Sequence, residues 1–330
     1  MRLSLPPARQ HKRQRGAALI TALLVVSLAT ILAVSLVEHL YYDIRRTENI
    51  LRLDQAQLYN INALEFGMGM LRLDRSKNND YDTLGEYSIK NEQAYPVTGG
   101  QVFAKILDQQ GCFNVNRLSK TSSDLPGNRA AFSRLLNNLG IDSALQSTLV
   151  DSLVDWLDTD DITEPQGAEF DYYIGLEKPY RTANTLMYSP SELRLVKGYT
   201  AKVIERIQPY ICALPDANTG ININTASAEM IESINGLANQ GERIVKDRDG
   251  SPESDEDDSP FIKLDDFTNY VKSSLKVKKF DSKGIQVYSE YFLIESNTQL
   301  GAGDIRSYNL VYRDQSDGKT RLIRQTRGAL

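Results

Sequence analysis

The chain has 330 residues, of which 41% are hydrophobic and 25% are charged, and its formal net charge is -5. At roughly 150 residues per domain, this length allows about two globular units. The composition is that of an ordinary globular protein, which excludes a disordered chain and a polytopic membrane protein. The acidic balance argues against nucleic acid as the main partner.

Histidine and cysteine are too scarce for much catalytic and metal chemistry. The only histidines, His11 and His39, flank the one long apolar run. The rest of the chain therefore has no histidine for a catalytic triad or a metal site. Cys112 and Cys212 are too few for a zinc cage and too far apart for a C-x-x-C redox motif. The sequence assigns no catalytic residue.

An uncharged run of 21 residues, 17–37, follows a basic leader that ends in Arg15 and Gly16. In a helix rising about 1.5 Å per residue, this run matches a bilayer core of roughly 30 Å, so it predicts one transmembrane segment. The basic flank predicts that the amino end is cytoplasmic and that residues from Glu38 onward lie across the membrane. The alternative is a signal peptide cut near residues 33–35, but its apolar region usually has only about 7 to 15 residues.

Residues 38–73 contain no proline and repeat apolar residues at intervals of three, four and seven. This period predicts that one helix continues from Ala17 to Leu73, with Gly67 and Gly69 weakening its end. Its apolar stripe needs a domain packed on it. The part that a small sheet leaves uncovered offers a surface to the helices of partner subunits.

In the rest of the chain, the spacing of apolar residues changes twice between a strand-like and a helical period. Residues 128–158 and 191–211 have a helical period, which predicts a helical block in the middle of the chain. Alternation of apolar and polar residues predicts strands on both sides of it, with a hairpin turn at Asp317 and Gly318. The predicted strands are 87–89, 101–108, 285–294, 307–312 and 320–323. The helical block therefore splits the sheet.

The amino end resembles a known processing signal. A short basic leader ending in Gly16, followed by Ala17 and a long helix, is similar to the class III signal of type IV pilins and type II secretion pseudopilins. The resemblance implies that a prepilin peptidase cuts between Gly16 and Ala17 and N-methylates Ala17. Most members have glutamate at the fifth position after the cut, where this chain has Thr21. The loss of that acid resembles the K-type minor pseudopilins.

Five internal motifs strengthen the resemblance to the minor pseudopilin K family of type II secretion systems, also called the general secretion pathway protein K family. In the family's order they are GCFNVN (111–116), DWLDTD (155–160), GAE (167–169), PYRTAN (179–184) and ININTA (221–226). The resemblance covers nearly the whole chain. It implies an α+β, pilin-like fold, in which a long N-terminal helix packs on a small antiparallel sheet and a large α-helical domain is inserted.

The resemblance also implies an organisation and a function. The expected parts are a leader at 1–16, a transmembrane part of the helix at 17–37, the periplasmic helix and first strands at 38–110, the inserted helical domain at 111–280 and the last strands at 281–330. Such a protein is no enzyme. It forms the tip of the periplasmic pseudopilus and supports export of folded proteins across the outer membrane, and the bulk of its insertion blocks further addition of subunits above it.

The implied location is the bacterial inner membrane, crossed once, with the C-terminal domain in the periplasm. The implied partners are the minor pseudopilins I and J, the major pseudopilin, the prepilin peptidase and the inner-membrane assembly platform. In other pilin-like subunits, the glutamate at the position of Thr21 would neutralise the amino group of a neighbouring subunit in the filament. An unpaired charge in lipid is energetically costly. A tip subunit has no neighbour above it, so we expect Thr21 to be harmless.

A weak internal repeat around Gly198 and Gly236 resembles the helix-hairpin-helix module, which often binds DNA. That module offers Gly-x-Gly amides to a phosphate, near basic side chains. Here the second glycine is replaced by Thr200 or Ala238, and the acidic run 253–258 has the wrong charge for phosphate contacts. We favour a packing module, and a membrane-anchored periplasmic DNA-binding protein is the alternative function.

Acidic residues crowd the turn-rich stretch 155–171. Calcium takes roughly six to eight oxygen ligands, but this stretch lacks the glycine and final glutamate of an EF-hand loop, so solvated acids and helix caps are the alternative. The resemblance implies structural calcium in the helical domain. The candidate ligands are Asp158, Asp160, Glu169, Asp171 and Asn184. A membrane-anchored hydrolase that uses only the carboxylates of Asp155, Asp158 or Glu169 is a further alternative.

Cys112 and Cys212 are expected to form a disulfide, because the far side of a bacterial inner membrane is oxidising and an even pair there favours a bond. The bond would fasten the insertion to its neck. It would close a loop of roughly 100 residues, which the chain-entropy model values at up to about 4.7 kcal/mol. Two buried thiols that act as small apolar residues are the alternative.

Overall fold

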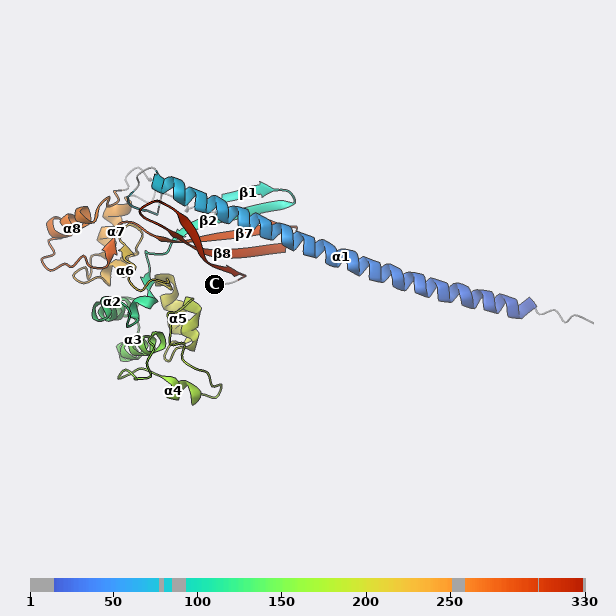
Figure 1. Ribbon diagram of the computed structural model, residues 1–330, viewed down its shortest axis with the longest axis horizontal. Coiled ribbons are helices and arrows are strands. Elements are labelled where there is room, and N and C mark those ends of the chain that lie inside the picture. Colours follow the sequence, from blue (N-terminus) through green and yellow to red (C-terminus); the bar gives the residue numbers. More distant parts are fainter. Residues whose placement is uncertain (1–14, 77–79, 85–92, 251–258, 302, 329–330) are drawn as a thin grey trace, which may run out of the picture. The chain divides into compact units, whose positions relative to one another are not determined.

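The computed structural model describes residues 15–76, 80–84, 93–250, 259–301 and 303–328. The chain divides into two compact units, Met1–Gln55 and Ala56–Leu330, which are treated separately. Helix α1 (Arg15–Ser76) begins in the first unit and ends in the second (Figure 1). Most of the predicted leader, the predicted strand at 87–89 and the acidic run 253–258 lie outside the described residues.

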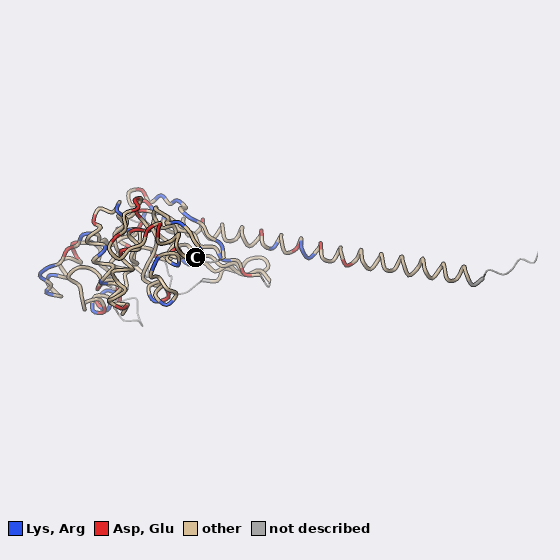
Figure 2. The backbone as a smooth tube through the Cα atoms, turned by 90° about the horizontal axis from the view of Figure 1, so that it is seen from below, with Lys and Arg blue, Asp and Glu red and all other residues tan. Residues whose placement is uncertain are grey.

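The first unit contains the apolar part of α1. Its large apolar side chains from Leu19 to Val37 are exposed, and the most apolar window has a mean hydropathy of 2.6. The amino-terminal stretch of this helix carries neither of the charge colours in Figure 2. The helix is long and apolar enough to cross a membrane once. The prediction of a long N-terminal helix is confirmed, although the helix continues past Gly67 and Gly69 to Ser76.

The second unit contains an antiparallel sheet of five strands in the order β1-β2-β7-β8-β9. Strands β2 and β7 come from distant parts of the chain and pair from Gly100 opposite Leu300 to Asp108 opposite Phe292. The prediction that an insertion splits the sheet is therefore confirmed. The strands are β1 (Gln93–Val97), β2 (Gly100–Asp108), β7 (Tyr291–Leu300), β8 (Gly303–Arg313) and β9 (Thr320–Arg327).

The C-terminal turns of α1 pack on this sheet. Leu64, Met68 and Leu71 are buried with side chains of β2, β7 and β8 in one apolar cluster. Gly67 lies on the same face, where an added Cβ atom would sit 2.8 Å from a methyl carbon of Ile294. The glycine therefore lets the helix backbone approach the sheet closely, which explains why it does not end the helix.

The helical insertion has its own core, which holds Trp156 and Tyr173 with ring centroids 5.3 Å apart. The stretch predicted as helical at 128–158 is two helices, because Gly140 turns the chain with φ +63°. The described part of the insertion contains α2 (Leu125–Asn138), α3 (Ser143–Leu157), α4 (Phe170–Ile174), α5 (Ala201–Ile207), α6 (Ala228–Glu232), α7 (Gly241–Asp249), α8 (Leu264–Ser273) and the 3-10 helices η1 (Val115–Leu118), η2 (Pro190–Leu195) and η3 (Gln208–Tyr210).

One predicted strand was wrong in its extent. Residues 285–294 are not continuous, because β6 (Ile285–Gln286) pairs with β5 (Ile221–Asn222) in a separate parallel ladder, and β7 begins only at Tyr291. A second short parallel ladder joins β3 (Phe113–Asn114) to β4 (Ile211–Cys212). The turn predicted at Asp317 and Gly318 is present, with Gly318 at φ +70°.

The insertion joins the sheet at a polar neck. Cys112 and Cys212 form a disulfide with their Cα atoms 5.9 Å apart. The Asn222 amide donates hydrogen bonds to the Asp108 carboxylate at 3.1 Å and the Ser289 hydroxyl at 2.9 Å. The Asn116 amide donates to two buried backbone carbonyls. These motif asparagines are therefore structural, and the insertion limits at 111 and 280 stay a prediction.

Candidate metal centre

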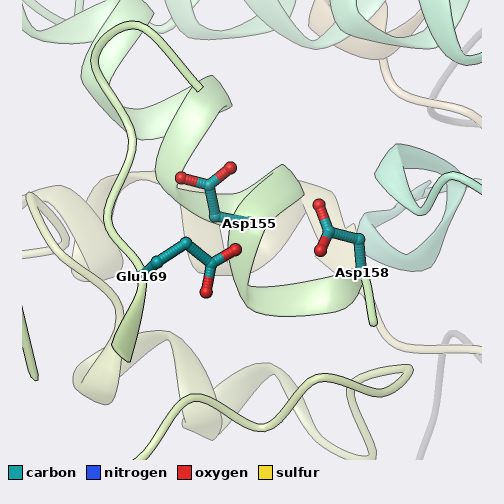
Figure 3. A group of neighbouring side chains, drawn as sticks. All are labelled: Asp155, Asp158 and Glu169. Carbon is teal, nitrogen blue, oxygen red and sulfur yellow. The ribbon is translucent and has the colours of Figure 1, made fainter. Parts of the chain in front are cut away.

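Three buried carboxylates converge at the end of α3 (Figure 3). Asp155 lies in the last turn of α3, Asp158 follows the helix as its C-cap, and Glu169 precedes α4 as its N-cap. One oxygen of each carboxylate lies within 4.8 Å of the other two. The residues are 0%, 2% and 4% exposed, so this is no solvated acidic surface.

Side chains of α3 hold the loop that returns to this cluster. The Asp155 carboxylate accepts a hydrogen bond from the Glu164 backbone N–H at 3.1 Å. One turn earlier, the Asp151 carboxylate accepts from the Gln166 N–H at 3.1 Å. The Arg129 guanidinium pairs with Asp151 and, at 3.1 Å, with Glu164. These contacts fix the backbone that leads into Glu169.

Gly167 is required by the cluster itself. A Cβ atom at this position would lie 1.9 Å from an oxygen of the Asp155 carboxylate. The Lys197 ammonium also donates to the Gly167 carbonyl at 2.8 Å, which fixes the loop from the other side. The GAE motif therefore combines a glycine that makes room for Asp155 with the glutamate that faces it.

The electrostatics of the cluster favour a bound cation. Burial, together with the charges of the neighbouring carboxylates, raises the pKa of Glu169 to about 7 and that of Asp155 to about 6. Both Glu169 oxygens are buried and accept no hydrogen bond from any residue the structure describes. A buried carboxylate without partners is costly when it is ionised, unless a positive charge lies against it.

Lys120 supplies one positive charge at the edge of the cluster. Its ammonium lies 3.0 Å from Asp158 Oδ2 and 2.6 Å from Asp160 Oδ2. Burial raises the pKa of Asp158, and the hydrogen bond from Lys120 opposes this shift. A separate hydrogen bond from Lys120, to Asp160 Oδ2, lowers the pKa of Asp160. No ion pair between Lys120 and Glu169 is present among the described residues.

The five candidate ligands from the sequence take different places. Asp158 and Glu169 belong to the cluster, whereas Asp160 is partly exposed beside Lys120 and Asp171 is exposed on α4. Asn184 has a buried side-chain oxygen without a hydrogen-bond partner and a φ of 46°, a left-handed conformation that asparagine tolerates. Nothing described places Asn184 within the cluster.

Asp155 was not among those candidates, although its spacing contains a signal. Residues three apart on a helix share a face, so Asp155 and Asp158 point to the same side of the end of α3. Oxygen ligands of this kind suit calcium, whose shell also accepts amide, carbonyl and water oxygens. The three carboxylates therefore fit a divalent cation. Two grooves in the second unit, of about 590 and 380 Å³, are lined by other residues, so neither gives these acids a substrate cleft.

The residues of the expected processing signal lie in the first turns of α1. Gly16 and Ala17 are helical. The Thr21 hydroxyl donates hydrogen bonds to the carbonyls of Ala17 at 3.1 Å and Ala18 at 3.0 Å. Its polar group is therefore satisfied inside its own helix, as is usual for threonine in an apolar helix.

Comparison with known proteins identifies the family. The sequence model described as type II secretion system (T2SS), protein K, matches residues 111–216. The type II secretion system protein K of Pseudomonas aeruginosa is 32% identical over 96% of this chain and 94% of its own length. The chain belongs to the type II secretion system protein K family. The protein K of Aeromonas hydrophila is 35% identical over 66% of this chain and 69% of its own length.

A solved structure shares the fold of this protein K family member. A chain in the crystal structure of the GspK-GspI-GspJ complex from the enterotoxigenic Escherichia coli type 2 secretion system superposes with a TM-score of 0.71. It is 22% identical, and the match covers 86% of this chain and 100% of that chain. The segment matched by the protein K model contains both cysteines and all three carboxylates of the cluster.

Proposed function

We propose that this chain is a minor pseudopilin that forms the tip of the periplasmic pseudopilus and supports export of folded proteins across the outer membrane. The observation that best supports this function is the architecture of the chain. A helix with an uncharged, membrane-length beginning ends against a small antiparallel sheet, and a large helical insertion splits that sheet. The similarity to protein K of Pseudomonas aeruginosa extends over 96% of the chain, which supports this role for the chain as a whole.

The proposed location is the bacterial inner membrane, with the second unit in the periplasm. The exposed apolar part of α1 supports an anchor, and a disulfide is typical of an oxidising compartment. The proposed partners are the minor pseudopilins I and J, because the similar solved chain comes from a GspK-GspI-GspJ complex. The major pseudopilin, the prepilin peptidase and the assembly platform are proposed from the family role.

The proposed role is structural and not catalytic. The buried carboxylates of Asp155, Asp158 and Glu169 line neither of the two described grooves. We propose that they bind structural calcium, with Asn184 as a further oxygen donor. The ion would neutralise the cluster and hold the loop after α3. Calcium should therefore raise the Tm of the full chain in detergent micelles, a chelator should reverse the rise, and Glu169→Gln should reduce it.

The decisive test of processing is the mature amino terminus in the native host, by intact mass and terminal peptide sequencing. A start at N-methylated Ala17 supports cleavage after Gly16 by a prepilin peptidase. A start near Leu36 would mean a secreted soluble protein, and an intact Met1 would mean an ordinary membrane anchor. Either of these outcomes would contradict the pseudopilin proposal.

The tip position has its own test in a host strain that lacks the native gene. The wild-type chain should restore secretion of a folded substrate. Thr21→Glu should not increase that secretion, because a tip subunit has no neighbour above it whose amino group the glutamate could neutralise. A clear gain in secreted substrate with Thr21→Glu would contradict the tip position. No observation favours the DNA-binding alternative.

A further inference from the structure

A groove of about 590 Å³ lies between the sheet and the helical insertion, beside the disulfide. Its walls include residues of β2 and β7 on one side and of η2 and α5 on the other; α5, β2 and β7 are labelled in Figure 1. Apolar side chains such as Ile204 and Leu293 form part of the lining. Arg324 of β9 also lines this groove.

Arg324 is a buried charge without an acidic partner. It is 9% exposed, and its guanidinium carbon lies 4.9 Å from the centre of the Tyr188 ring. Its backbone pairs with Leu310 in the sheet, but its guanidinium makes no hydrogen bond or ion pair with any described residue. Arg313, which is also buried, pairs with two carboxylates. Charged side chains are rarely buried unless they are paired. Arg117 and Arg324 are both buried without an ion pair among the described residues, and of these two it is Arg324 that lines the groove.

The acids around the groove do not supply the missing partner. Glu192 favours the charged form of Arg324, but its carboxylate accepts hydrogen bonds from the N–H groups of Tyr188 at 2.7 Å and Ser189 at 3.0 Å. Glu295 lines the groove and pairs with Lys105 at 2.7 Å.

Asp108 lines the groove as well, and its carboxylate accepts hydrogen bonds from Asn222 at 3.1 Å and from the Ser289 hydroxyl. Glu205 also lines the groove, but no ion pair joins it to Arg324 among the described residues. Arg194 lines the groove as a second arginine and has no ion pair with a described residue. The groove therefore offers two guanidinium groups without a bound carboxylate.

We propose that this groove is a docking site for an acidic side chain of a partner subunit, whose carboxylate pairs with Arg324. A guanidinium presents a planar fork that matches a carboxylate with two parallel hydrogen bonds. The volume and the mixed lining suit a side chain together with its backbone better than a small free anion. The inference rests on the proposed function, because the partner is the I or J minor pseudopilin.

The test compares Arg324→Met with Arg321→Met in the full chain, purified in detergent micelles. Arg321 lies on the same strand, is exposed and stacks over Tyr312 at 4.7 Å, so its loss changes the charge equally outside the groove. Affinity for purified I and J is measured for wild type and both variants, together with Tm. We expect Arg324→Met to weaken binding at least about tenfold, since truncating one member of a buried charge pair mainly speeds dissociation. Arg321→Met should bind as wild type does.

The stability of the free chain separates docking from a purely structural role. Removing a buried charge that has no partner should leave the Tm of Arg324→Met unchanged or raise it. A photocrosslinking residue at Gln208, an exposed position of the groove, should capture I or J, whereas one at Lys272 on α8 should not. The crosslink also decides the question if Arg324→Met fails to fold.

Any of the following results would overturn the inference. If Arg324→Met binds I and J as wild type does, or if Gln208 gives no crosslink in a complex that forms, the groove is not the docking site and the proposed function still stands. If Arg324→Met lowers the Tm and Gln208 gives no crosslink, the arginine is structural. If the wild-type chain binds neither I nor J, the proposed partnership fails and the docking inference fails with it.

Discussion

The Arg313 guanidinium and the Asp82 carboxylate form an ion pair inside the protein, with both side chains at most 2% exposed. One nitrogen of the guanidinium donates to both Asp82 oxygens, at 2.7 and 2.6 Å. A second nitrogen donates to Asp74, in the last turn of α1, at 2.9 Å. The Ser289 N–H donates to Asp82 at 2.7 Å. The pair therefore ties the end of α1 to β8 and to the segment that leads into β7.

Replacing Arg313 should strongly destabilise the second unit. Arg313→Met leaves Asp82 buried without its cation, and breaking a buried pair in this way costs about 3–5 kcal/mol. Thermal unfolding of the full chain in detergent micelles, followed by circular dichroism, should show a clearly lower Tm.

Arg306→Gln is the matched control for this prediction. Arg306 lies on the same strand and pairs with Asp304 at 3.6 Å, but the two side chains are 56% and 44% exposed. Exposed pairs contribute at most about 1 kcal/mol, so the control should unfold close to wild type. An equal decrease of Tm in the two variants would contradict the prediction that the buried pair stabilises the fold more than the exposed pair does.

Asp108 should make the stability of the chain depend on pH. Burial raises its pKa to about 6, hydrogen bonds from Ser289 and Gln110 oppose the shift, and the charge of Asp82 adds to it. The fold therefore favours the protonated acid. Its contribution to the free energy of unfolding is complete below the ordinary pKa of 3.8 and is lost as the pH rises through about 6.

The difference between wild type and Asp108→Asn isolates this group from other acids. Between pH 4 and pH 7, the Tm of wild type should fall relative to that of Asp108→Asn, because an amide has no proton to lose in this range. The measurement is thermal unfolding of both chains in a pH series at constant ionic strength. Parallel curves would show that the pKa of Asp108 is the same in the folded and unfolded chain.

Much of the fold was predictable because its signals are local. An uncharged run of membrane length, a helical period after it and the alternation in residues 101–108 depend only on neighbours in sequence. The break between Gln286 and Tyr291 was not predictable. Ile285 pairs with Ile221, and Ser289 donates to Asp82 and Asp108, so distant contacts end one ladder and begin another.

The candidate site was predictable only in part for the same reason. Asp158 and Glu169 stand out by composition, but Asp155 joins them because the loop returns to α3 past Gly167. Arg324 gives no signal in sequence, since an arginine on a strand is ordinarily exposed. Its burial depends on β9 lying beside the groove, which only the assembled fold shows.

The disulfide should contribute substantially to stability. Cys112 and Cys212 close a loop with a sequence separation of 100, and the chain-entropy model gives up to about 4.7 kcal/mol for such a loop. The double variant Cys112→Ser, Cys212→Ser should therefore have a markedly lower Tm, and a reductant should lower the Tm of wild type but not that of the double variant. An unchanged Tm in the double variant would show that the neck contacts of Asn116 and Asn222 suffice.

Lys120 should oppose calcium binding, because its ammonium already lies against Asp158 and Asp160. A divalent ion in the cluster is repelled by this charge, and Asp158 cannot serve both cations equally well. Lys120→Gln should therefore tighten calcium binding by roughly three- to tenfold, as expected for removing one unit charge close to a partly exposed site. Calcium titration of the full chain, by calorimetry and by Tm, measures the effect.

The control is Lys283→Gln, which removes an exposed lysine paired with Asp124 at 3.4 Å and leaves the cluster untouched. It should bind calcium as wild type does, which would exclude the change in net charge alone as the cause of tighter binding by Lys120→Gln. If Lys120→Gln instead weakens binding, the lysine organises the ligands, because Asp158 then needs the ammonium to keep its position. If both variants match wild type, calcium lies beyond the reach of the Lys120 charge, and Asp158 is not among its ligands.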